Sequence, residues 1–127
     1  MIQRGAVNAS MEARLTLRLR GPSGNVLDVD ALIDTGFSGQ LSLPLDGASG
    51  LGLNHGRAGQ IILADGSSVP YLSFGIEVEW SGSVHQVRTA AFGDDVVIGM
   101  GLLSGHALMI EATVGGAVTI VLLMSAL

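Results

Sequence analysis

Polar and apolar residues alternate along two neighbouring segments near the start of the chain. Leucine occupies every second position within residues 14–20, and apolar residues do the same within residues 25–33. A period of two is typical of strands that have one face against a core and the other in solvent. The Gly-Pro-Ser-Gly segment at residues 21–24 indicates a turn between them. The pattern therefore predicts a β-hairpin that leads directly to Asp34.

Shorter apolar runs, separated by glycine-rich turns, predict further strands along the rest of the chain. We expect these strands at residues 41–43, 60–64, 67–80, 84–92, 96–98, 108–111 and 117–123. Residues 65–66 (Asp-Gly) and 81–82 (Ser-Gly) indicate two-residue hairpin turns. One clear short helix is expected at residues 100–104, closed by Gly105, and residues 45–53 have room for one helical turn. The predicted fold class is all-β.

The composition fits one folded domain spanning residues 1–127. Hydrophobic residues make up 48% of the chain, which excludes disorder, whereas charged residues make up only 13%. A small domain with so little charge exposes apolar surface unless a second subunit covers it. The composition therefore favours an oligomer.

Charge along the chain indicates which partners to expect. The net charge is −5 at pH 7, and all 6 basic residues are arginine. They form no run long enough for a nucleic-acid surface, so we expect no nucleic-acid partner. Arg14, Arg18 and Arg20 on one predicted strand, and Asp28 and Asp30 on the next, are expected to form a solvated strand face.

The chain contains no cysteine, which excludes disulfide frameworks and thiolate metal sites. His55, His85 and His106 lack the spacing of metal ligands, so we expect ordinary surface or hydrogen-bonded histidines and no metal site. The start of the chain has no apolar signal core. The apolar run at residues 117–124 is too short to span a bilayer. We therefore expect a cytoplasmic protein with no membrane partner.

Candidate chemistry begins with the carboxylate of Asp34, which follows a predicted buried strand and precedes Thr35 and Gly36. A carboxylate in this place costs free energy unless it is hydrogen-bonded. Gly36 has no side chain, so its amide is free to bind the carboxylate and another backbone can approach closely. The Thr35 hydroxyl can brace the loop. Taken alone, the tripeptide fits an ordinary turn or an Asx cap better than a catalytic loop.

A later segment repeats the pattern of this one. Residues 97–101 (Val-Ile-Gly-Met-Gly) resemble residues 32–36 (Leu-Ile-Asp-Thr-Gly), because each is an apolar strand followed by a short turn that closes on glycine. Gly99 stands where the first segment has Asp34. A duplicated half-fold would produce such a pattern.

Three segments together carry a family resemblance. They are residues 31–36 (Ala-Leu-Ile-Asp-Thr-Gly), 63–67 (Leu-Ala-Asp-Gly-Ser) and 97–103 (Val-Ile-Gly-Met-Gly-Leu-Leu). In their order and spacing, over nearly the whole chain, the sequence resembles the retropepsin-like aspartic peptidases, in particular the small bacterial single-domain relatives of retroviral proteases. The resemblance implies a closed, mostly antiparallel β-barrel with one short helix near the C-terminus, active as a homodimer.

The same resemblance implies an activity and the residues that perform it. It implies an aspartic endopeptidase in which two Asp34 carboxylates, one from each subunit, activate a water to hydrolyse a peptide or protein substrate without metal or cofactor. The catalytic residues implied are Asp34, Thr35 and Gly36. The substrate-binding flap implied consists of Ala64, Asp65 and Gly66.

The sequence departs from the family pattern directly after the catalytic tripeptide. Phe37 stands where these enzymes more often have Ala or Ser, and Ser38 is displaced by one residue. We interpret Phe37 as a core or interface anchor rather than a substrate-binding residue. The departure motivates an alternative function, a dimeric β-barrel binding or structural module of the same fold with weak or absent catalysis.

Overall fold

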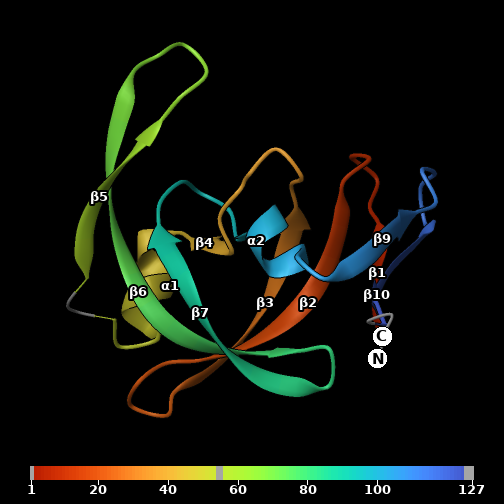
Figure 1. Cartoon of the computed structure of the whole chain (residues 1–127), viewed down its shortest axis with the longest axis horizontal. Helices are drawn as coiled ribbons and strands as arrows, with labels where there is room; N and C mark the ends of the chain where they lie inside the picture. The colour runs from red at the N-terminus through yellow and green to blue at the C-terminus, as the bar shows by residue number, and fades with distance from the viewer. Residues whose placement is uncertain (1, 54–55, 125–127) are drawn as a thin grey trace.

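A computed structural model describes residues 2–53 and 56–124 of the chain. Within these residues, ten strands form one continuous sheet in the order β5-β6-β7-β4-β8-β3-β2-β1-β10-β9 (Figure 1). The strands are β1 (Ile2–Val7), β2 (Ala13–Arg20), β3 (Val26–Ile33), β4 (Leu41–Leu43), β5 (Arg57–Ile62), β6 (Ser68–Trp80), β7 (Ser83–Ala91), β8 (Val97–Ile98), β9 (His106–Ile110) and β10 (Ala117–Leu122). The helices are α1 (Leu45–Gly50) and α2 (Met100–Leu103). The predicted all-β fold is confirmed.

The sheet closes into a barrel because β2 pairs with both β3 and β6. Leu19 of β2 lies opposite Val78 of β6, which joins β6-β7-β4-β8-β3-β2 into a ring. Pairing within the ring is antiparallel except between β3 and β8 and between β4 and β7. The expected closed, mostly antiparallel barrel is therefore confirmed. The β5–β6 hairpin extends from one side of the ring, and β1, β9 and β10 lie on the other (Figure 1).

The alternating leucines of β2 face the core of the barrel. Leu15, Leu17 and Leu19 are 3%, 0% and 0% exposed, as the period of two predicts. On the paired strand β3, Ala31 and Ile33 are also buried. Burial of each leucine or isoleucine side chain stabilises the folded state by roughly 1.5–3 kcal/mol. This burial anchors the backbone immediately before Asp34.

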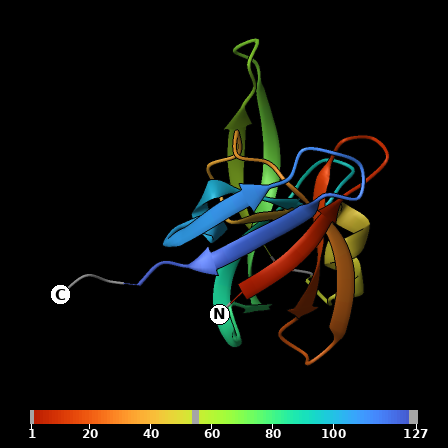
Figure 2. The same ribbon diagram turned by 90° about the vertical axis from the view of Figure 1, so that its right-hand side faces the viewer.

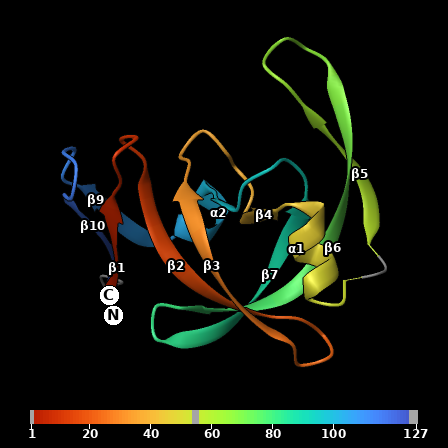
Figure 3. The ribbon, with the colours of Figure 1, turned by 180° about the vertical axis from the view of Figure 1, so that it is seen from behind.

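Both helices are short. The expected helix at residues 100–104 is present as α2, and the helical turn for which residues 45–53 have room is present as α1, so the fold has one helix more than the single C-terminal helix expected. Pro44 precedes α1 with a φ of −58°, close to the helical value, so the chain enters the helix without strain. Figure 3 shows α1 near β6 and β7. None of the described helices is long and apolar enough to cross a membrane.

The sequence pattern does not predict β1, which pairs with β2 and with β10. Ile2 is 50% exposed, and Val7 is the one fully buried residue of the strand, so no apolar periodicity marks it. Figure 2 shows β1 alongside the β9–β10 hairpin. The three strands extend the sheet beyond the barrel.

The two predicted hairpin turns have different outcomes. The two-residue turn at residues 81–82 is confirmed, since Trp80 lies opposite Ser83. The prediction of a two-residue turn at residues 65–66 is wrong. The Leu63 amide donates to the Ser67 carbonyl at 2.8 Å, so the loop between these two residues has three residues, 64–66. Gly66 has a φ of 84°, and a left-handed glycine after a type I turn is a common form of three-residue hairpin loop.

Candidate active site

Asp34 is the first residue beyond the buried end of β3. β3 runs parallel to β8 there, with Ile33 opposite Ile98. The Asp34 amide continues the ladder by donating to the Ile98 carbonyl at 2.9 Å. The backbone of Asp34 is therefore fixed by the sheet, whereas its side chain is exposed.

The Asp34-Thr35-Gly36 loop is a tight turn that binds its own carboxylate. The Gly36 amide donates to Asp34 Oδ1 at 2.8 Å, and the Phe37 amide donates to the Asp34 carbonyl at 3.1 Å. This is the Asx geometry that a carboxylate in a turn favours. All three residues of the tripeptide are exposed in the single chain. The loop thus presents an oriented carboxylate and the Thr35 side chain at the surface.

The repeated segment lies directly beside this loop and holds it by backbone contacts. The Met100 amide donates to the Phe37 carbonyl at 2.7 Å, and the Gly101 amide donates to the Gly39 carbonyl at 3.0 Å. A Cβ on Gly99 would lie 2.2 Å from the Gly39 carbonyl oxygen, so any side chain there would collide with the loop. The sequence repeat therefore corresponds to two adjacent turns, as Figure 1 shows for the end of β3 and α2.

Phe37 is accommodated because its neighbours are glycines. The ring is half-buried, and a Cβ on Gly39 would lie 2.5 Å from its Cζ atom. Gly99 leaves space for the ring in the same way, because an added Cβ there would lie 2.6 Å from the Phe37 ring. The aromatic residue that departs from the family pattern is thus packed into the loop itself, as an anchor within one chain.

Two pockets open beside Asp34. One, of about 240 Å³, is lined by Asp34, Phe37, Ser42, Phe92, Gly93, Asp94, Asp95 and Val97. The other, of about 440 Å³, is lined by Val7, Met11, Glu12, Ala13, Leu32, Ile33, Asp34, Ile110 and Ala112. The carboxylate therefore lies between a pocket formed within the barrel strands and a pocket bordered by the β1–β9–β10 extension.

Two solved structures resemble the fold of this chain. A retropepsin-like aspartic protease from Rickettsia conorii matches with a TM-score of 0.64 at 15% sequence identity, over 94% of this chain and 90% of that one. EIAV protease complexed with the inhibitor HBY-793 matches with a TM-score of 0.55 at 20% identity, over 76% of this chain and 88% of that one. The chain has a retropepsin-like fold. No family model and no curated protein matches the sequence.

In this retropepsin-like fold, the predicted flap residues lie at the tip of the β5–β6 hairpin. Ala64, Asp65 and Gly66 are exposed, and the hairpin projects away from the barrel (Figure 1). The Asp65 carboxylate accepts hydrogen bonds from the amide and hydroxyl of Ser67 at 2.9 and 2.5 Å, which lower the pKa of Asp65. The tip residues line neither of the two pockets at Asp34. The structure therefore does not bring the flap tip to the carboxylate.

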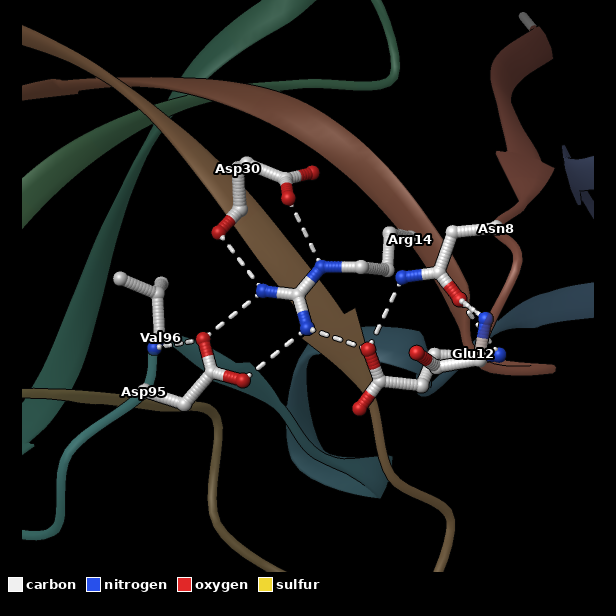
Figure 4. Close-up of polar contacts among 7 residues, drawn as sticks. Asn8, Glu12, Arg14, Asp30, Asp95 and Val96 are labelled. Atoms are coloured by element: carbon white, nitrogen blue, oxygen red, sulfur yellow. Dashed lines mark hydrogen bonds and ion pairs between the residues drawn. The ribbon is translucent and has the colours of Figure 1, made fainter.

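A cluster of ion pairs around Arg14 braces the wall of the smaller pocket (Figure 4). Arg14 donates from Nη2 to Asp95 Oδ1 at 2.8 Å, from Nε to Asp30 Oδ2 at 2.8 Å, and from Nη1 to Glu12 Oε1 at 3.2 Å. The Arg14 side chain is only 14% exposed. The expectation that Arg14 belongs to a solvated strand face is therefore wrong. Its partners come from the residue before β2, from β3 and from the loop before β8. Nothing in the local pattern reveals the contact with Asp95 across 81 positions.

The same cluster favours the charged form of Asp95. The hydrogen bond from Arg14, supported by charge attraction and by the Val96 amide, lowers the pKa of the Asp95 carboxyl. The reciprocal contact raises the pKa of Arg14. Arg18 and Asp28 form a separate pair whose side chains are 50% and 52% exposed, which fits the expected solvated face.

Two of the three histidines are hydrogen-bonded, as expected. His85 Nε2 lies 2.9 Å from the Ser83 hydroxyl, and His106 Nε2 lies 2.5 Å from the Ser81 hydroxyl. His55 lies outside the described residues. Within residues 2–53 and 56–124, no group of three His, Cys, Asp or Glu side chains is arranged to hold a metal ion.

Proposed function

We propose that the chain is an aspartic endopeptidase that acts as a homodimer. The observation that carries the proposal is the Asp34 carboxylate, which a fixed strand end and the Gly36 amide orient at the surface beside two pockets. The retropepsin-like fold supports it, because the two matching structures are described as proteases. The substrate is a peptide or protein bound across the two pockets, and residues 64–66 would cover it only if the β5–β6 hairpin moves toward Asp34.

The requirement for a second subunit follows from the chemistry. One carboxylate cannot be general base and general acid in the same step. Two carboxylates a few ångströms apart do not both ionise readily, so they share one proton and titrate as a pair. The ionised Asp34 takes a proton from a water, which attacks the peptide carbonyl. The protonated Asp34 of the other subunit hydrogen-bonds that carbonyl and then helps to protonate the leaving nitrogen.

The surface around Asp34 suits such a partner. The chain has a single Asp-Thr-Gly, and the repeated segment has Gly99 in place of a second aspartate. Met11 and Ile110, which line the larger pocket at Asp34, are 55% and 40% exposed. A second subunit at this surface would cover them and place its own Asp34 nearby, with the two Thr35 hydroxyls available to brace the loops.

The proposal is tested by peptide cleavage with wild type and Asp34→Asn over a broad library between about pH 3 and 7. We expect cleavage by wild type, inhibition by pepstatin-type compounds, and a loss of at least about 10³-fold in kcat/KM for Asp34→Asn. The variant dimer should be at least as stable as wild type, because like charges at the axis cost free energy. Undiminished cleavage by the variant would refute the assignment. No cleavage by either protein would favour the binding module of the same fold.

A further inference from the structure

The smaller pocket at Asp34 combines aromatic, polar and acidic walls. Phe37 and Phe92 contribute aromatic surface, and Ser42 is a buried polar residue, 5% exposed. Asp94 contributes an exposed carboxylate. The volume of about 240 Å³ is below the roughly 300–1,000 Å³ of pockets that hold whole small-molecule ligands, so it suits a single long side chain.

Of the two acidic residues in the loop before β8, Asp94 is the one available to a ligand. Asp95 accepts from Arg14 at both carboxylate oxygens, at 2.8 and 3.0 Å, so its charge is already balanced. Asp94 is engaged in none of the ion pairs among the described residues. The pocket therefore has one uncompensated carboxylate besides Asp34 itself.

Ser42 supplies a second polar contact inside the pocket. The residue is only 5% exposed and lines the pocket, so an occupant can reach its hydroxyl. A ligand with a hydrogen-bond donor gains by donating to this hydroxyl. A purely apolar occupant would satisfy the aromatic walls and make no such bond.

We propose that this pocket receives the side chain next to the cleaved bond and selects arginine there. The inference rests on the proposed function, because Asp34 lines the same pocket. The apolar stem and planar guanidinium of arginine stack on Phe92 and on the open part of the half-buried Phe37 ring, which would then contact substrate as well as anchor the loop. Its five N–H donors are enough to reach both the Asp94 carboxylate and the Ser42 hydroxyl. Lysine has the same charge but lacks the planar face, and the net charge of −5 favours the approach of basic peptides in general.

The test compares two peptides that differ at one position, arginine in one and citrulline in the other. Citrulline keeps the shape of the arginine side chain and removes its charge. Binding is measured by fluorescence anisotropy to the Asp34→Asn protein, which retains the pocket without the chemistry, and cleavage is measured with wild type. We expect arginine to be favoured by roughly tenfold in both assays. Asp94→Asn should reduce this ratio to near one, whereas Asp46→Asn, which removes an exposed charge from α1, should leave it unchanged.

The outcomes separate this inference from the proposed function. Equal affinity for the two peptides, a preference that survives Asp94→Asn, or no binding of either peptide would overturn the pocket assignment, even if wild type cleaves other peptides. An arginine preference in binding that Asp94→Asn removes would support the pocket assignment, even if wild type cleaves nothing and the proposed function fails. Thermal unfolding of Asp94→Asn should match that of wild type, which shows that the lost preference comes from the pocket.

Discussion

The ends of β3 and β8 lie side by side in parallel register but have opposite roles. Asp34, after β3, is exposed and directs a carboxylate to the surface. Gly99, after β8, is buried and has no room for a Cβ beside the Gly39 carbonyl. One turn presents a carboxylate, and the other supplies the space in which the first turn is held. A repeated backbone pattern therefore does not imply a repeated side chain, and the carboxylate pair that we propose would need a second copy of β3.

Filling the space at Gly99 should have the largest effect on stability. Gly99→Ala places a Cβ 2.2 Å from a backbone oxygen, so either α2 or the loop at residues 37–40 must move. We expect a loss of about 2–4 kcal/mol in the free energy of unfolding, measured by denaturant titration. Gly50→Ala is the matched control, because an added Cβ there meets nothing within 4 Å. Equal stability of the two variants would show that the contact between the turns is not tight.

Removing the charge at Arg14 should have the next largest effect, because it loosens the segment that leads into β8. Arg14→Met leaves Asp95 and Asp30 without their partner, and the Arg14 side chain is 14% exposed. We expect the free energy of unfolding, measured by denaturant titration, to fall by about 1–3 kcal/mol. This range lies between the losses on breaking surface ion pairs and those on breaking buried ones. Arg18→Met, which breaks the exposed pair with Asp28, should cost less. A larger effect at Arg18 would contradict the role assigned to the cluster.

The pH dependence of stability should report the same contact. Because the folded-state pKa of Asp95 is lowered by Arg14, the stabilisation is complete above the unfolded pKa of about 3.9 and is lost as pH falls through the folded value. Arg14→Met should therefore lose less stability than wild type between about pH 5 and 2. Parallel pH profiles for the two proteins would exclude Asp95 as a source of this dependence.

The smallest effect is expected at Thr35, which is exposed in the single chain. Thr35→Val keeps the shape of the side chain and removes the hydroxyl that we propose braces the two loops across the dimer. We expect the dimer dissociation constant, measured by sedimentation, to rise by roughly tenfold. Stability of the separated subunit should not change, because the described structure gives the residue no buried role. An unchanged dissociation constant would remove Thr35 from the interface.

Much of the barrel could be predicted because its strands alternate cleanly. The buried leucines of β2 and the approach of β3 to Asp34 follow from a period of two. β1 could not be predicted, since five of its six residues are not fully buried and leave no periodic signal. The three-residue loop between β5 and β6 is one residue longer than the expected turn, a distinction that the Asp-Gly pair does not encode.

The candidate site was predictable in its carboxylate but not in its surroundings. Asp34 and its Gly36 contact follow from a local motif of adjacent residues. The Arg14–Asp95 contact joins residues 81 positions apart, and strand alternation alone would direct Arg14 into solvent. Long-range ion pairs depend on how loops close around the barrel, and no local pattern contains that information.

The most direct test of the central claim, that each chain supplies half of one active site, is the activity of mixed dimers. Wild-type and Asp34→Asn chains are refolded together at varied ratios, and peptide cleavage is measured at constant total protein. If two Asp34 carboxylates are required, only wild-type homodimers cleave, and activity falls with the square of the wild-type fraction, to about a quarter in an equal mixture. Activity that falls in direct proportion to the wild-type fraction would show that a single Asp34 suffices and would contradict the account.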